Sequence, residues 1–337
     1  MKKLKVLALF DAIGPTSIDQ DLSAELKTED WSSEADVLKA LRKLGHRTEY
    51  VAIFDDLELL RQKLRYFKPH VIFNLCDQFH NNRAFDQHIA AYLELCGVPF
   101  TGCGATGLTL AKHKGISKKI LAYHGLRVPR FVNLPYGSRI MRPQQLKFPL
   151  VVKPMNEEAS LGISQSSLVE TDHQLRKRVR FLRDKYAHDV IVEEYIHGRE
   201  LYVSLLGDRT LKVFPIREIL FEDVPESEPR IASYRAKWDY DYRWKWGIDN
   251  QFARLRPALK RRIQRFGRQV FRLLKLDGYA RLDLRITPDE EVVFIEANPN
   301  PILARHEDFA HAAVKSGMRY HELIQAILRI GMERHGT

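Results

Sequence analysis

The first hundred residues alternate between short apolar runs and longer amphipathic segments, and this alternation restricts the fold more than any other feature of the chain. The short apolar runs are Lys5–Phe10, Arg47–Ile53 and Val71–Leu75. The segments with helical spacing of apolar residues are Trp31–Leu44, Leu57–Phe67 and Phe85–Leu95. Strands that alternate with helices favour a parallel sheet, because parallel neighbours need a crossover connection. We therefore expect a parallel α/β domain over residues 1–100.

The rest of the chain mixes strands and helices less regularly. The predicted strands are Phe148–Lys153, Ser164–Val169, Val190–Tyr195, Glu200–Leu206, Leu211–Ile219, Ala280–Ile286 and Glu291–Glu296. The predicted helices are Leu108–His124, Gln174–Tyr186, Pro257–Leu274 and Tyr320–Ile330. The segment Asp223–Asn250 is aromatic and charged without a clear period, which favours a long functional loop. Because 337 residues exceed what one hydrophobic core usually serves, we expect two further units, 101–206 and 207–337. The fold class is then α/β, becoming α+β in its C-terminal part.

The composition is that of an ordinary soluble globular protein, with 45% apolar and 29% charged residues. The formal net charge is +11, and a dense basic cluster lies between Lys260 and Arg272. Apolar residues at helical spacing run through the same stretch. The cluster is therefore either the solvated face of an amphipathic helix or a surface that attracts phosphate. No zinc-finger, recognition-helix or RNA-binding signature accompanies it, so we expect no nucleic-acid partner.

The cysteines and the N-terminus bear on the compartment. Cys76, Cys96 and Cys103 show no Cys-x-x-Cys spacing, which fits buried small side chains in a reducing cytosol. The apolar run near the N-terminus ends at Asp11 and is too short for a signal peptide or a membrane span. We expect a cytoplasmic protein with no membrane segment.

Two carboxylates and an amide lie close together near the end of the chain. Asp283 falls within the predicted strand Ala280–Ile286, and Glu296 and Asn298 fall at the exit of the next strand. If the two strands are antiparallel neighbours, Asp283 lies beside Glu296. Two close carboxylates repel each other unless a cation lies between them, and oxygen ligands suit Mg²⁺. A surface hairpin with both acids in water is the alternative. Apolar neighbours in both strands count against it, but this pattern alone leaves both interpretations open, and the metal site is favoured only together with the cationic residues and motifs that follow.

Cationic side chains are placed to accompany such a site. Arg281 lies two residues before Asp283 and hence on the same face of the strand, where it could stabilise a transferring phosphoryl group or an oxyanion. Lys153 ends an apolar strand and is either a phosphate ligand or an ordinary edge lysine. The loop Asn156–Gly162 that follows it contains small residues, including Ser160, whose backbone amides could approach phosphate oxygens.

The loop after Leu75 leaves the carboxyl end of a predicted parallel strand, where such sheets bind their ligands. It contains the polar residues Asp77, His80, Asn81 and Asn82. Each could be an ordinary capping or solvated residue, and together they are candidates for substrate contact.

Taken in order, these motifs resemble the ATP-grasp superfamily and, within it, the D-alanine–D-alanine ligase family. The resemblance extends from about Val71 to Ile330. It rests on the entry Phe100-Thr101-Gly102-Cys103, the lysine helix, Lys153 with its small-residue loop, Glu193-Glu194-Tyr195-Ile196 followed by Glu200, then Lys237, Arg281-x-Asp283 and Glu296-x-Asn298. No single motif is specific, but their order is.

The resemblance implies roles for the matching residues. Lys114, Lys153 and the loop at Ser160 would hold the phosphates of ATP. The hinge Glu193, Glu194, Tyr195 and Ile196 would meet adenine, and Glu200 would bind the ribose. Lys237 would reach the γ-phosphate and Arg281 would stabilise the tetrahedral species, so these two are the candidate catalytic residues. Asp283, Glu296 and Asn298 would ligate two Mg²⁺ ions.

The implied reaction phosphorylates a carboxylate with ATP and then lets an amine attack the acyl phosphate. The partners would be small-molecule carboxylate and amine substrates, and the family's habit of dimerising suggests a homodimer.

The substrate half departs from the family pattern. Ala159 and Trp238 stand where the family has a serine and a tyrosine that position the substrate. The family's Asn-x-Ser-Pro-Gly turn is replaced by Asn298-Pro299-Asn300-Pro301-Ile302, and Asp19 is a weak counterpart of its N-terminal glutamate. Arg305 could meet a substrate carboxylate or be a surface arginine. We infer a ligase that joins amino acids or small peptides other than two D-alanines. A true D-alanine–D-alanine ligase and a non-catalytic nucleotide- or nucleic-acid-binding protein are the alternatives.

Overall fold

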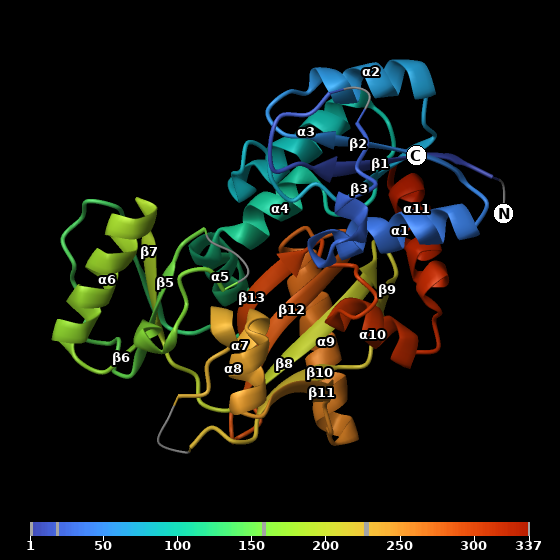
Figure 1. Cartoon of the computed structure of the whole chain (residues 1–337). Coiled ribbons are helices and arrows are strands. Elements are labelled where there is room, and N and C mark those ends of the chain that lie inside the picture. Colours follow the sequence, from blue (N-terminus) through green and yellow to red (C-terminus); the bar gives the residue numbers. More distant parts are fainter. Residues whose placement is uncertain (1–2, 18–19, 157–159, 226–228, 336–337) are drawn as a thin grey trace.

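A computed structural model describes residues 3–17, 20–156, 160–225 and 229–335 (Figure 1). Three sheets organise the chain, and helices cover their faces. The predicted α/β fold class, with a parallel N-terminal sheet, is confirmed. Within the described ranges, no helix is long and apolar enough to cross a membrane.

The N-terminal sheet has the order β2-β1-β3 and is entirely parallel, as predicted. Its strands are β1 (Lys5–Asp11), β2 (Arg47–Ile53) and β3 (Val71–Asn74). The connecting helices are α1 (Ser32–Lys43), α2 (Glu58–Phe67) and α3 (Asp86–Cys96), with short 3₁₀ turns at Glu25–Lys27, Glu29–Trp31 and Arg83–Phe85. Strands β1 and β3 and the second half of β2 are apolar and buried, whereas the first half of β2 is polar and partly exposed.

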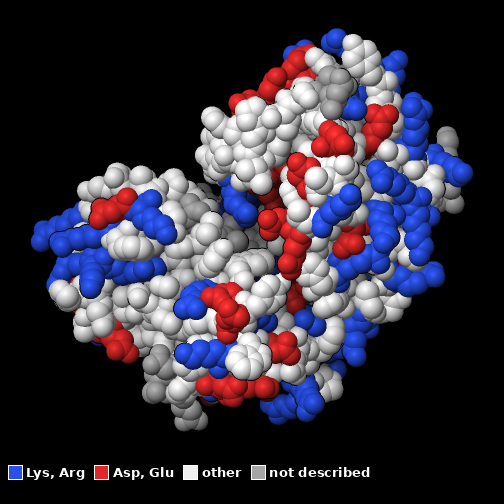
Figure 2. Space-filling view, in the orientation of Figure 1, with Lys and Arg blue, Asp and Glu red and all other residues white. Residues whose placement is uncertain are grey.

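The central sheet is antiparallel, with the order β4-β7-β5-β6. Its strands are β4 (Phe131–Leu134), β5 (Leu150–Pro154), β6 (Leu168–Val169) and β7 (Val190–Glu194). Helix α6 (Asp172–Tyr186) packs on it through Leu175, Val179 and Leu182. The solvent face of α6 is basic, and Figure 2 shows Lys and Arg side chains gathered on this lobe.

The third sheet has the order β11-β10-β8-β12-β13, with β9 paired to β8. Its strands are β8 (Arg199–Gly207), β9 (Leu211–Val213), β10 (Arg217–Phe221), β11 (Ile248–Phe252), β12 (Gly278–Ile286) and β13 (Val292–Pro299). Helix α9 (Pro257–Leu273) covers one face, and its predicted apolar residues, including Ile263 and Val270, are buried there. This is the amphipathic helix predicted for the basic cluster. We propose that the third unit begins before β8, because β8 pairs with β10 and β12.

The opposite face of this sheet carries the candidate site between two groups of helices. Helices α7 (Tyr234–Trp238) and α8 (Tyr240–Lys245) form a lid over one end, and α10 (Asp308–Lys315) and α11 (Tyr320–His335) cover the other end (Figure 1). The lid rests on a small apolar cluster that includes Tyr202, Ile219 and Ala236. Between the two groups of helices, polar side chains of the sheet lie on a part of this face that no described helix covers.

Four local predictions were wrong. The single strand predicted over 211–219 is two strands, β9 and β10, separated by residues 214–216. The helix predicted over 108–124 is two helices, α4 (Ala105–Lys112) and α5 (Lys114–Tyr123), because His113 is extended and its side chain caps α5 by accepting from the Ile116 amide. The strand predicted over 164–169 is a 3₁₀ turn, Gln165–Ser167, followed by the short strand β6. The predicted loop 223–250 contains the lid helices and the start of β11.

Candidate functional site

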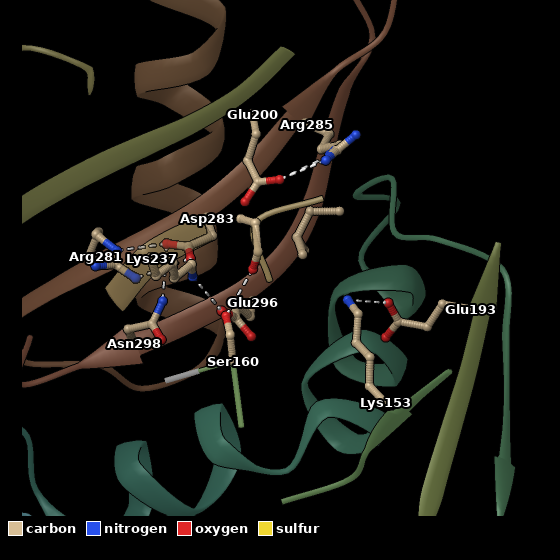
Figure 3. Close-up of polar contacts among 12 residues, drawn as sticks. Lys153, Ser160, Glu193, Glu200, Lys237, Arg281, Asp283, Arg285, Glu296 and Asn298 are labelled. Carbon is tan, nitrogen blue, oxygen red and sulfur yellow. Dashed lines mark hydrogen bonds and ion pairs between the residues drawn. The ribbon is translucent and has the colours of Figure 1, made fainter. Parts of the chain in front are cut away.

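The acids of the C-terminal segment face each other across two strands. Strands β12 and β13 are antiparallel neighbours, as predicted, and their register places Asp283 opposite Glu296 and Arg281 opposite Asn298. Residues opposite one another in such a pair point to the same face. The four side chains therefore form a compact polar group on the open face of the sheet (Figure 3).

Asp283 is the centre of this group. The Nε and Nη2 atoms of Arg281 donate to its two oxygens at 2.8 and 3.1 Å, and Asn298 Nδ2 donates at 3.1 Å. Lys237 reaches in from α7, with its Nζ 3.3 Å from Asp283 Oδ2 and 3.8 Å from Glu296 Oε1. The structure thus brings together five of the predicted residues from three separate segments of the chain (Figure 3).

Burial and the neighbouring cations control the charge of this group. Burial raises the pKa of Asp283, and Arg281 and Lys237 act against the rise. Burial also acts to raise the pKa of Glu296, but Lys237 and the more distant Lys114 and Lys153 outweigh it and hold that pKa well below its usual range. Asp283 in turn raises the pKa of Arg281. Glu296 is therefore charged at neutral pH.

The donor set fits Mg²⁺. Asp283, Glu296 and the amide oxygen of Asn298 offer hard oxygen ligands, which Mg²⁺ prefers together with phosphate oxygens. Over the described parts of the chain, no three His, Cys, Asp or Glu side chains cluster as metal ligands. This agrees with a site of two carboxylates and one amide, completed by a substrate.

A pocket opens beside this group, between the central sheet and the third sheet. Its lining includes the predicted residues Lys153, Ser160, Glu193, Glu194, Tyr195, Ile196, Glu200, Lys237 and Glu296. In Figure 3, Lys153 and Glu193 face the Asp283 group from the other side of this pocket. Most of the predicted nucleotide residues and one predicted metal ligand, Glu296, therefore line one pocket, whereas Lys114, Asp283 and Asn298 are not part of its lining.

Glu193 lies inside the wall of the pocket rather than at its hinge. It is 1% exposed, and its carboxylate lies 3.0 Å from Lys153 Nζ and 2.9 Å from Lys118 Nζ. Burial acts to raise the pKa of Glu193, but the two lysines outweigh it and lower that pKa. Glu193 thus holds both lysines in place and balances their charge.

Sequence reasoning missed Lys118. It is fully buried on α5, and its Nζ also donates to the Ile295 carbonyl on β13 at 2.7 Å. Burial lowers its pKa, against the attraction of Glu193. The spacing of four residues from Lys114 was the available signal, because it places both lysines on one face of the helix. Lys118 therefore links α5 to β13 and to the wall of the pocket.

The hinge residues are held by arginines. Glu194 Oε1 accepts from the Arg130 amide at 3.0 Å and pairs with Arg127. Glu200 pairs with the buried Arg285, whose Nε and Nη2 lie 3.2 and 2.8 Å from Glu200 Oε2. Arg285 also donates to the Ile196 carbonyl at 2.9 Å. Sequence reasoning did not identify Arg285, although it lies two residues after Asp283 on the same strand face.

The phosphate loop and the lid are joined. Ser160 Oγ donates to the Ala232 carbonyl at 3.0 Å, and the Tyr234 amide donates to the Ile163 carbonyl at 3.1 Å. The side chain of Ser160 thus faces the lid, while the predicted role of the loop rests on its amides. Lys237 and Trp238 lie on the lid, and Trp238 is 38% exposed. Ala159 lies outside the described residues.

The candidate substrate residues of the N-terminal half are held by other contacts. The Asp77 amide donates to Asp11 Oδ1 at 2.8 Å, and the ring of His80 lies 5.4 Å from that of Phe54. Asp19 lies outside the described residues. Asp77 and His80 therefore stay predictions as substrate contacts.

Arg305 is occupied within the protein. Its Nε donates to Asp36 Oδ1 at 3.0 Å, and its guanidinium lies 4.4 Å from the ring centre of Tyr320. The geometry therefore favours a structural role for Arg305, in which it contacts Asp36 and Tyr320, over binding of a substrate carboxylate.

Comparison with known proteins agrees with this geometry. The family described as D-ala D-ala ligase C-terminus matches residues 112–329. A D-alanine–D-alanine ligase of Desulforudis audaxviator is 30% identical over 260 residues, which cover 76% of this chain and 80% of that protein. The uncharacterized protein y4sG of Sinorhizobium fredii is 31% identical over 306 residues, 89% of this chain and 87% of that protein.

A solved structure shares the fold. The crystal structure of a D-alanine–D-alanine ligase from Bacillus anthracis, complexed with ATP, aligns over 99% of both chains with a TM-score of 0.76 at 19% identity. The family match covers more than half of the chain, and it is the family that the order of the motifs indicated. The chain belongs to the D-alanine–D-alanine ligase family of the ATP-grasp superfamily, whose members are ATP- and Mg²⁺-dependent carboxylate–amine ligases.

Proposed function

We propose that this protein joins an amino acid or small peptide, through its carboxylate, to an amine substrate, and that the pair differs from two D-alanines. The observation that supports ligase chemistry is the convergence of Arg281, Lys237, Asp283, Glu296 and Asn298 at the mouth of the pocket. Such a group places cations and oxygen ligands where negative charge develops during phosphoryl and acyl transfer.

The nucleotide binds in the pocket between the central sheet and the third sheet under this proposal. Lys153 and Lys114 hold phosphate oxygens, and burial by itself would lower the pKa of Lys153, but Glu193 and Glu296 outweigh it and raise that pKa. The ammonium group is therefore charged when phosphate arrives. Glu200, held by Arg285, meets the ribose, and the backbone of Glu194–Ile196 meets the adenine.

The residues around Asp283 act on the reacting groups. Lys237 approaches the γ-phosphate from the lid, and Arg281 faces the oxygen that gains charge when the carboxylate is phosphorylated and again when the amine attacks. Asp283, Glu296 and Asn298 would hold Mg²⁺, which neutralises phosphate charge when bound. The lid covers this group and excludes water, which would otherwise hydrolyse the acyl phosphate.

The rebuilt substrate half supports a substrate pair other than two D-alanines. Trp238 gives the lid a large indole where the family pattern has a tyrosine. The segment after Asn298 is fixed by contacts of its own, because Asn300 Oδ1 accepts from the Cys103 amide at 2.7 Å and the Leu303 amide donates to Ser33 Oγ at 3.1 Å. The segment that would face the second substrate therefore has a different shape.

A screen for ADP release tests this proposal. Purified protein with ATP and Mg²⁺ is supplied with single amino acids, pairs of amino acids and short peptides, and Arg281→Ala serves as the inactive control. We expect ADP and an amide product with a pair that is not two D-alanines. Failure of every pair to release ADP above the Arg281→Ala control would contradict ligase function.

The alternative is D-alanine–D-alanine ligation itself. It is favoured by the family match over residues 112–329 and by the names of the relatives. D-Alanine supplied alone with ATP discriminates between the two, because formation of the dipeptide at rates that exceed every other pair would restore this activity.

A further inference from the structure

The ring of Tyr202 lies under both candidate catalytic cations. The guanidinium carbon of Arg281 is 4.8 Å from the ring centre, and the Nζ atom of Lys237 is 5.6 Å from it. Both distances fall within the range in which the negative face of an aromatic ring attracts a cation. One ring therefore contacts two cations that come from different elements, β12 and α7.

The position of this ring is fixed by the sheet and by the lid. Tyr202 lies on β8, directly opposite Asp283 on β12 and Arg217 on β10. It is 2% exposed and packs in one apolar cluster with Ile219, Ala232, Ala236 and Ile248. A ring held on several sides has little rotational freedom, so it offers the cations a fixed surface.

The hydroxyl group of Tyr202 does not account for its position. Among the described residues it has no hydrogen-bond partner, although it is fully buried. Burial, with Glu200 and Asp283, raises the pKa of Tyr202 well above its ordinary value. The phenol therefore stays neutral at neutral pH. What Tyr202 offers to Arg281 and Lys237 is the face of its ring.

The other contacts of these cations are with the proposed metal ligands. Arg281 pairs with Asp283, and Lys237 lies near Asp283 and Glu296. Carboxylates that bind Mg²⁺ have fewer lone pairs for nearby cations, whereas the ring face is available in both states. Because the site is buried, the attraction of the ring is stronger than at an exposed surface.

We propose that Tyr202 is a positioning residue for the ligase reaction: its ring holds Arg281 and Lys237 in their working orientation while Asp283 and Glu296 bind metal. This inference rests on the proposed function, since it assumes that both cations act in the reaction. It adds a residue on β8 to a site otherwise built from β12, β13 and the lid.

The test compares variants that change the ring in steps. Tyr202→Phe keeps the ring and removes only an unpaired hydroxyl. Replacement of Tyr202 by phenylalanines with one, two and three ring fluorines keeps the shape and progressively removes the negative ring face. Tyr202→Leu removes the ring, and Ile219→Ala is the matched control because it opens the same apolar cluster without touching a cation.

We expect Tyr202→Phe to keep kcat within about threefold, since the ring face is retained. The fluorine series should lower kcat stepwise, and Tyr202→Leu should lower it by about tenfold or more. The KM for ATP should change little, because the pocket contacts are intact. Ile219→Ala should keep kcat per folded molecule.

Two results would overturn the inference. A flat fluorine series would show that the negative ring face is not used, and a loss in Tyr202→Phe equal to that in Tyr202→Leu would assign the role to the hydroxyl. Either result can be distinguished from failure of the proposed ligase function. If the ligase proposal fails, the unmodified protein releases no ADP. If only the role of Tyr202 fails, the unmodified protein is active and Arg281→Ala still inactivates it.

Discussion

Replacement of Glu193 by Gln removes the negative charge that lies between Lys118 and Lys153. Both ammonium groups lie within 3.0 Å of the Glu193 carboxylate, and all three side chains are at most 10% exposed. The amide of glutamine preserves the size of the side chain, so the variant isolates the charge. Two buried lysines then face each other without the carboxylate that contacts both.

The cost follows from the alternatives open to the variant. Removing one partner of a buried ion pair destabilises a protein by about 3–5 kcal/mol. The variant can instead release a proton from one lysine, and at pH 7 this costs about 4.6 kcal/mol for an ordinary lysine pKa. This second value is a ceiling, because the protein follows the cheaper route. We therefore expect the free energy of unfolding to fall by about 3–4.6 kcal/mol at pH 7.

Urea unfolding at pH 7 and pH 9 measures this effect. In the variant, one lysine has a lower pKa in the folded state than in the unfolded state. This difference destabilises the folded state at pH values below the unfolded-state pKa, and the penalty shrinks as the pH rises toward that value. The ceiling falls to about 1.9 kcal/mol at pH 9. The control is Glu333→Gln, which removes an exposed pair with Arg329 and should cost less than about 0.5 kcal/mol. A loss below about 1 kcal/mol for Glu193→Gln at pH 7 would refute the reasoning.

Three further predictions concern the site and its surroundings. Asp283→Asn and Glu296→Gln should each lower ADP release at least about a thousandfold while circular dichroism shows a folded protein; normal turnover in both would remove the proposed metal site. Arg285→Met should raise the KM for ATP more than it lowers kcat, because Glu200 and the Ile196 carbonyl lose their common donor; steady-state kinetics decide this, and an unchanged KM would contradict it. Burial, with Asp11 nearby, raises the pKa of Glu34 to about 7. Stability is therefore lost as the pH rises from about 4.5 to about 7, because only the unfolded state ionises there, and the full penalty remains above pH 7. Glu34→Gln should raise the free energy of unfolding at pH 8 by up to about 3 kcal/mol. That gain should disappear below the ordinary glutamate pKa of about 4.5, and thermal unfolding across this range would refute the prediction if the gain were the same at every pH.

The parts of the fold that the sequence predicted well are those where one physical rule dominates. Buried strands such as Lys5–Asp11 are continuous apolar runs, and α9 has a strong amphipathic period. Short elements were missed because packing rather than local sequence stabilises them. The lid helix α7 has only five residues, which is too short to be stable alone, and it depends on the contact of Ala236 with the apolar cluster beneath it.

The residues of the candidate site divide in the same way, into those that local sequence predicts and those that only tertiary packing brings together. Asp283, Glu296 and Arg281 could be found because the strand period and a two-residue spacing place them on one face. The position of Glu193 could not, since its two lysines lie on α5 and β5 and approach it only when the central sheet packs on α5. The same applies to Arg305, whose partner Asp36 is 269 residues away in the chain.

Two of the missed residues could nevertheless have been identified from the sequence, because residues two positions apart in a strand share a face. Arg285 follows Asp283 by two residues on β12, and Tyr202 follows Glu200 by two residues on β8, so each shares a face with a residue that had been identified. Tyr202 was passed over because an aromatic residue in a strand is usually core. Its ring is core on the side of Ile219, but its other contacts are Arg281 and Lys237. A buried aromatic residue at a face-sharing position beside candidate catalytic cations is therefore a candidate part of the site, and the fluorine series tests whether that reading holds for Tyr202.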